Sequence, residues 1–168
     1  MKIKLNQTAR ASTTDIGKLE AFLGEPLDAF FRKFVFDHDG AEPEDNTFPF
    51  DPAGNHRSGV RRFVPVKDIP SLAGDLELPP KCFPVAYDST GNHVIIDQTK
   101  GGSVFFLDHE VDAPPSFLAA DFNSFLGMLE PPTGVPSLQP GQARTIWKHP
   151  DFETKFAKFL KPKADPPQ

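Results

Sequence analysis

The stretch that most constrains the fold lies in the middle of the chain, over residues 83–107. Two turn-forming segments divide it, DSTGN at residues 88–92 and KGG at residues 100–102. The three pieces around these turns are apolar, and the central piece, HVIID at residues 93–97, is rich in β-branched residues. Short apolar runs joined by tight turns are typical of neighbouring antiparallel strands. The sequence therefore predicts a three-stranded antiparallel meander.

Two helical patterns precede the meander. In the first, apolar residues at helical spacing follow a predicted N-cap at Thr13 or Thr14, and Gly24 is placed to end the helix. In the second, the apolar stripe is stronger, Pro26 suits the first helical position, and Gly40 is expected to end the helix. Gly17 weakens the first helix, so we expect its stability to come from docking.

The remaining connections are irregular. Prolines and glycines predict a loop over residues 42–59, a short edge strand within residues 60–66, and an irregular segment with one helical turn over residues 69–80. After the meander, Asp121 is placed to cap another helix. A last amphipathic helix is predicted from Pro150.

Helices, then a meander, then helices predict an α+β fold, in which an antiparallel meander sheet is flanked by N-terminal and C-terminal helices. The length of 168 residues suits one main folded domain. We divide the chain into an N-terminal extension over residues 1–14, an α+β domain over 15–130, and a proline-rich linker, C-terminal helix and basic tail over 131–168.

Composition narrows the classes of partner. The net charge of −5 argues against nucleic acid, because phosphate binding needs a basic surface. No apolar run approaches the roughly 20 residues of a membrane helix, so we expect no membrane partner. Cys82 is the sole cysteine, so no internal disulfide is available. We interpret Cys82 as a buried apolar residue and the protein as cytoplasmic.

Two histidines stand beside acids and invite a metal or hydrolase interpretation. His38 lies between Asp37 and Asp39, and His109 lies between Asp108 and Glu110. Neighbours on a strand point to opposite faces, so Asp108 and His109 cannot easily hold one ion. We favour polar ends of secondary-structure elements in both places. The sequence thus predicts no catalytic residue, no metal and no cofactor.

Acidic residues are unevenly spread along the chain. Residues 34–56 hold six acids without a lysine or arginine, and residues 101–143 again hold acids without a base. Two such segments could form one negative face that steers and holds a basic protein. The predicted partner contacts are Asp37, Asp39, Glu42, Glu44 and Asp45, followed by Asp108, Glu110 and Asp112.

Four pieces of the chain carry a resemblance to a known family. They are LEAFLG leading into PLDAFF (residues 19–31), HDG (38–40), PVAYDSTGN followed by VIID (84–97), and VFFLDHE with the helix DFNSFL after it (104–126). In this order they resemble the SUKH superfamily, the Smi/Knr cell-wall-assembly-regulator-like proteins. The helix end departs from the usual Asn-Gly pair, because Asp39 and Gly40 stand there.

The resemblance implies an α+β fold around an antiparallel sheet and no general catalytic set. It also implies a role, since many bacterial members resemble immunity proteins that neutralise secreted toxins, often nucleases, and fungal members are regulatory scaffolds. The family motif is represented by Tyr87, Asp88, Gly91, Asn92 and Asp97. Gly91 can supply a positive φ and Asp88 can bond the turn backbone. We interpret this motif as structural, with the binding surface elsewhere.

These observations favour a non-catalytic module that binds a protein, and an immunity protein acting on a basic toxin such as a nuclease in particular. Two alternatives stay open. One is a regulatory scaffold with an endogenous partner, and the other is a metal-dependent hydrolase that uses His38 or His109.

Overall fold

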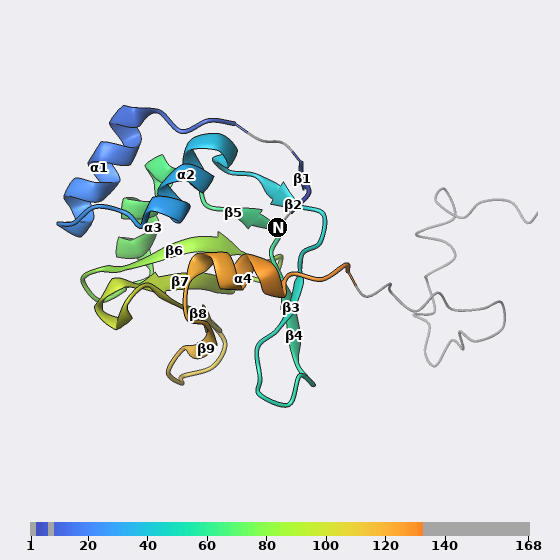
Figure 1. Ribbon diagram of the computed structural model, residues 1–168. Helices are drawn as coiled ribbons and strands as arrows, with labels where there is room; N and C mark the ends of the chain where they lie inside the picture. The colour runs from blue at the N-terminus through green and yellow to red at the C-terminus, as the bar shows by residue number, and fades with distance from the viewer. Residues whose placement is uncertain (1–2, 7–8, 133–168) are drawn as a thin grey trace, which may run out of the picture. The chain divides into compact units, whose positions relative to one another are not determined.

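The computed structural model describes residues 3–6 and 9–132 of the chain (Figure 1). The linker, last helix and basic tail predicted for residues 131–168 lie outside the described residues from position 133 onward. Residues 5–6, in the predicted N-terminal extension, form a short strand that pairs with residues 42–43.

The fold contains four α-helices and nine strands within the described residues. The helices are α1 (Thr13–Leu23), α2 (Ala29–His38), α3 (Ile69–Asp75) and α4 (Phe122–Met128), with 3-10 turns η1 (Val66–Asp68) and η2 (Gln98–Lys100). The strands are β1 (Leu5–Asn6), β2 (Glu42–Pro43), β3 (Thr47–Pro49), β4 (Arg57–Gly59), β5 (Arg62–Phe63), β6 (Cys82–Tyr87), β7 (His93–Asp97), β8 (Ser103–Leu107) and β9 (Ser116–Ala119).

The main sheet has five antiparallel strands in the order β5-β6-β7-β8-β9. Its three central strands are the predicted meander, and the α+β class is confirmed. The edge strand predicted within residues 60–66 is β5. β1–β2 and β3–β4 form two separate two-stranded sheets.

The core lies between the sheet and the helices, and phenylalanine rings join them. Phe31 of α2 contacts Phe83 of β6 with ring centroids 5.7 Å apart, and Phe122 of α4 lies 4.9 Å from Phe31 and 5.0 Å from Phe34. α2 and α4 therefore lie side by side over the sheet (Figure 1). Tilted and edge-to-face ring contacts of this kind add to the apolar burial that stabilises the layers.

Both N-terminal helices begin at residues other than those predicted. Ser12, not Thr13 or Thr14, is the N-cap of α1, and its Oγ accepts a hydrogen bond from the backbone N of Asp15 at 3.0 Å. Asp28 caps α2 by accepting from the backbone N of Phe30 and Phe31. A carboxylate satisfies two free N–H groups there, and this outweighs the preference of Pro26 for the first helical position.

The loop predicted over residues 42–59 is more ordered than expected. It holds β2, which has two residues, and the hairpin β3–β4, in which each strand has three residues. Phe48 on β3 is fully buried and its ring lies 5.4 Å from that of Phe125 on α4. Burial of one large ring thus fixes a hairpin that has almost no sequence periodicity of its own.

Candidate functional site

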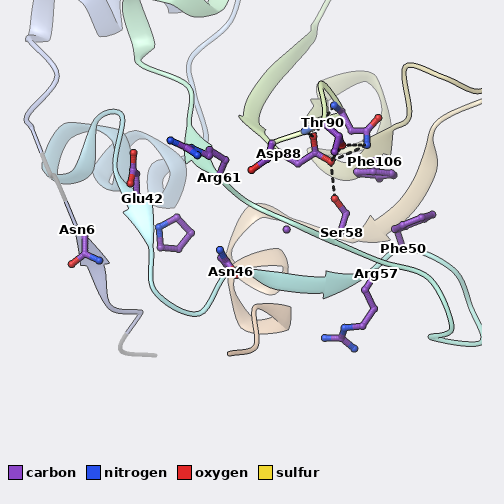
Figure 2. Close-up of a pocket in the computed structure, with 14 residues that line it drawn as sticks. Asn6, Glu42, Asn46, Phe50, Arg57, Ser58, Arg61, Asp88, Thr90 and Phe106 are labelled. Carbon is purple, nitrogen blue, oxygen red and sulfur yellow. Dashed lines mark hydrogen bonds between the residues drawn. The ribbon is translucent and has the colours of Figure 1, made fainter. Parts of the chain in front are cut away.

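An open groove of about 810 Å³ lies where the two small sheets meet the turn between β6 and β7 (Figure 2). β1 and β2 line one side of it, β3–β4 and residues 88–92 line the other, and Phe106 of β8 also lines it. Its lining residues are Asn6, Glu42, Pro43, Asn46, Phe50, Arg57, Ser58, Gly59, Arg61, Asp88, Ser89, Thr90, Asn92 and Phe106.

Asp88 organises the wall of the groove. Its carboxylate accepts hydrogen bonds from the backbone N and the Oγ1 of Thr90 (2.8 and 2.9 Å), and from the backbone N and the Nδ2 of Asn92 (2.9 and 2.8 Å). Burial raises the pKa of Asp88, but these hydrogen bonds outweigh it and hold the pKa below its ordinary value. The carboxylate is therefore ionised and already engaged by donors of the chain.

The same carboxylate ties the turn to the β3–β4 hairpin. The Oγ of Ser58 donates a hydrogen bond to Oδ2 of Asp88 at 3.0 Å, which Figure 2 marks with a dashed line. At the other strand of the hairpin, the backbone groups of Thr47 and Glu130 bond one another at 3.0 and 2.8 Å. Two segments far apart in the chain thus hold the hairpin in place.

One part of the groove is aromatic. The rings of Phe50 and Phe106 are stacked, with centroids 4.6 Å apart and an interplanar angle of 24°. Phe106 is buried, while Phe50 is partly exposed in the loop after β3. This pair offers an apolar surface to a side chain that enters the groove.

Within residues 3–6 and 9–132, Glu42 and Arg61 are the charged groups of the groove that form neither an ion pair nor the network of hydrogen bonds that engages Asp88. Arg57 does form an ion pair, with Glu130, although its buried Nε finds no hydrogen-bond partner in that part of the chain. Arg61 is exposed, and Glu42 is half-buried. A ligand in the groove therefore meets one acid and one base, Glu42 and Arg61, whose charged groups are not already engaged by the described chain.

The predicted acids of the first segment are divided among different surroundings. Only Glu42 lines the groove. Asp37 pairs with Lys33 at 2.7 Å, and Glu44 pairs with Lys4 at 3.8 Å. Asp39 accepts a hydrogen bond from the backbone N of Val66 at 2.7 Å, while burial raises its pKa.

Asp45 is half-buried and lies one residue before the groove residue Asn46. The second acidic set, Asp108, Glu110 and Asp112, lies in the loop between β8 and β9. This loop contacts the 88–92 turn, because Nδ1 of His109 lies 2.8 Å from Oδ1 of Asn92. The structure thus places Asp108 and Glu110, the neighbours of His109, near the groove wall, and none of the three acids is among the lining residues.

The two histidines have different neighbours. His109 bonds the amide of Asn92, and the ring of His38 packs 5.5 Å from that of Phe34. Within residues 3–6 and 9–132, no three His, Cys, Asp or Glu side chains converge in an arrangement that could hold a metal ion.

The remaining motif residues serve the sheet. Asp97 is buried at the end of β7, and Thr99 and Lys100 donate to its carboxylate. Burial acts to raise its pKa, yet these donors and the Cys82 thiol lower it overall. Burial, and then the charge of Asp97, raise the pKa of Cys82 to about 11.

The motif residue Tyr87 contributes through its backbone. Its carbonyl accepts a hydrogen bond from the backbone N of Arg61, and this bond joins the end of β6 to the groove.

Sequence reasoning missed most of the groove. It considered Glu42 and the motif residues Asp88 and Asn92, but not Arg57, Ser58 or Arg61. The motif turn is structural in its hydrogen bonds, and it also lines the groove. The one available signal was the cluster of arginines at residues 57–62 directly after an acidic segment.

Comparison with known proteins agrees with the resemblance. The model of the family described as SMI1 / KNR4 family (SUKH-1) matches residues 10–128. No curated protein matches the chain. The matched range includes both walls of the groove except for Asn6 on β1.

Proposed function

The chain belongs to the SMI1/KNR4 family (SUKH-1), and on that premise we propose that it is a protein-binding module that neutralises a toxin by direct contact. Family membership is consistent with a non-catalytic binding role. None of the helices within the described residues is long and apolar enough to cross a membrane. We place its action in the cytoplasm, against a basic toxin such as a nuclease.

The groove is the observation that carries this proposal. Its wall is built by the turn that carries the family resemblance, and Asp88 in that turn already accepts five hydrogen bonds from the chain. A carboxylate engaged in this way holds a surface in shape and is poorly placed to transfer protons. A preformed surface binds with little loss of conformational entropy, which is an advantage in recognising a protein.

Charge complementarity supports a basic partner. Glu42, Glu44 and Asp45 follow one another at the side of the groove formed by β2. The pairing of Glu44 with Lys4 is exposed, so it contributes little stability and can be exchanged for a partner's base. Such acids raise the rate of encounter with a basic surface more than they raise the final affinity.

The direct test begins with capture of the partner from the native cell, its identification by mass spectrometry, and its purification. An immunity role predicts that the full chain binds the captured protein at a fixed stoichiometry and abolishes its toxic activity at that ratio. Cells lacking the chain should be killed by the same protein. A partner without toxicity, left unaltered in its activity, contradicts neutralisation and favours the regulatory scaffold.

A second test concerns the acids themselves. Reversing Glu42, Glu44 and Asp45 to lysine should slow association at low salt by roughly tenfold or more and flatten its salt dependence. The matched control reverses three exposed acids of the η1–α3 region, Asp68, Asp75 and Glu77, with the same change in net charge. Equal slowing in both triple variants would show that only net charge matters and would remove the groove-side acids from the proposal.

A further inference from the structure

One wall of the groove contains a free strand edge. Within the described residues β4 pairs with β3 alone, and the register of the two strands runs without a shift. The backbone N of Val60, the residue after β4, donates to the carbonyl of Asn46 at 2.7 Å. Bonded and non-bonded residues alternate along an antiparallel pair, so Ser58 also faces β3, whereas Arg57 and Gly59 turn their N–H and C=O groups to the other side.

This free side of β4 faces the groove. Two residues after Gly59, the backbone N of Arg61 points the same way and donates to the carbonyl of Tyr87, the last residue of β6, at 2.8 Å. The free groups of Arg57 and Gly59 therefore point past the end of β6, and both residues line the groove. No backbone group of the described residues bonds them on this side.

The edge lacks the usual protection. Sheet edges are commonly covered, bulged or guarded by charged side chains, because their unpaired backbone groups attract other strands. Gly59 has no side chain. Ser58 directs its Oγ to Asp88 at 3.0 Å, and Arg57 directs its guanidinium to Glu130. The backbone of β4 is therefore accessible in a wall whose side chains are already held in place.

We propose that the groove takes an extended segment of the protein partner, which lies along β4 as an added strand; this rests on the proposed function, in which the groove binds that partner. Arg57 and Gly59 each offer one backbone donor and one acceptor, which two alternate residues of the segment can engage. In this mode the main-chain bonds supply affinity and the side chains supply specificity. The groove volume of about 810 Å³ leaves room for several residues.

The two ends of the groove differ in chemistry. Figure 2 shows Glu42 toward one end and the rings of Phe50 and Phe106 toward the other, with Asn46 between them. The two rings are stacked, and they suit an apolar side chain. A segment that crosses the groove along β4 therefore places one side chain at each end, and the ring end takes the apolar one.

The other end of the groove selects a basic side chain. Glu42 and Asp45 form no ion pair within residues 3–6 and 9–132, while Lys4 occupies Glu44 at 3.8 Å. Arg61, which also lines the groove, opposes their attraction for a base. Two unpaired acids against one base leave the balance acidic, so the segment carries lysine or arginine at this end.

Selection of displayed random peptides of about seven residues on the full chain tests the proposal without knowledge of the partner. Multivalent display compensates for the weakness of a single short contact. Peptides that combine a base with an apolar residue should be enriched, and Glu42→Lys should exchange the base for an acid. Asp75→Lys reverses an exposed acid of α3 and is the matched control, which should leave the enriched sequences unchanged.

Pairing through the backbone is tested with an enriched peptide synthesised in two N-methylated forms. Each form carries the methyl groups on alternate residues, so one loses the N–H groups that face β4 and the other loses those that face away. Calorimetry should show at least tenfold weaker binding for one form and about equal binding for the other. The unmethylated peptide should also protect the amides of Arg57 and Gly59 from hydrogen exchange.

Three results overturn the proposal: no enriched peptide, enrichment that Glu42→Lys leaves unaltered, or equal binding of the two methylated forms. The groove then holds a folded surface and takes no extended segment. These results are separate from the proposed function, because the chain can still neutralise a captured toxin when the peptides fail. A captured partner without toxicity, bound through a segment of this kind, contradicts neutralisation and leaves the added strand in place.

Discussion

Replacing Asp88 by alanine should destabilise the protein more than its position in a surface turn suggests. The change removes all five hydrogen bonds that the Asp88 carboxylate accepts, including the one from Ser58 that joins the β3–β4 hairpin to the turn. A net hydrogen bond contributes about 1 kcal/mol, and bonds to a charged group contribute more. Because the site is only half-buried, water replaces part of the loss, and we expect a decrease of about 2–3 kcal/mol in the free energy of unfolding.

Urea unfolding measures this loss. With a slope of roughly 2 kcal/mol per molar urea, the midpoint of Asp88→Ala should fall by about 1–1.5 M at an unchanged slope. Asp88→Asn keeps one acceptor oxygen and should lose about half as much. Asp75→Ala, an exposed acid on α3, should change the free energy of unfolding by less than about 0.5 kcal/mol.

The pH dependence gives the sharper test of the Asp88 argument. The folded state lowers the pKa of Asp88 below the ordinary value of 3.8, so its stabilisation is complete above that value. It is lost as the pH falls through the lower, folded-state pKa. The difference between the native chain and Asp88→Ala should therefore be constant from pH 5 to 7 and shrink below about pH 4. A midpoint unchanged at pH 7, or a difference that persists undiminished at pH 2, would refute the reasoning.

Three further outcomes are expected. Cys82 should react with a thiol reagent at pH 8 at least 100-fold more slowly in the folded than in the unfolded protein, because a pKa of about 11 against 9.0 leaves roughly 100-fold less thiolate. Phe48→Ala should lower the free energy of unfolding by about 3–5 kcal/mol in a urea titration, whereas Phe22→Ala, on the surface, should lower it by less than about 1 kcal/mol. Gly91→Ala should lower the free energy of unfolding by about 1–3 kcal/mol, because the backbone φ of 105° strains an alanine and its Cβ would lie 3.2 Å from the ring of His109. Adding His109→Ala should relieve the contact with the ring but not the loss that comes from the backbone strain.

The fold was predictable where short-range patterns decide it. The runs of residues 83–107 alternate with turn formers, so the meander follows from local chemistry, and Asp121 caps α4 as predicted. The hairpin β3–β4 was not predictable in this way, because its seven-residue connection and short strands resemble a loop. Its order comes from Phe48 and from contacts with Glu130, which is more than 70 residues away.

The site was less predictable than the fold, because it is assembled from segments that are distant in sequence. Asn6, Glu42, Ser58 and Asp88 converge only once three sheets are in place. Acidity along the chain pointed to Glu42, but it could not show that Lys33 pairs with Asp37 or that Asp39 accepts a hydrogen bond from the distant backbone N of Val66. Local charge predicts candidates, and the tertiary pairing decides which of them remain available.

The central claim is that the groove beside the motif turn is where this protein holds its partner. Amide hydrogen exchange of the chain, free and in complex with the partner captured from its own cell, tests this most directly. The account predicts new protection at residues 42–46 and 57–61, with the 88–92 turn changing little, because Asp88 already holds it. Protection confined to other surfaces, with residues 42–46 and 57–61 exchanging as in the free chain, would contradict it.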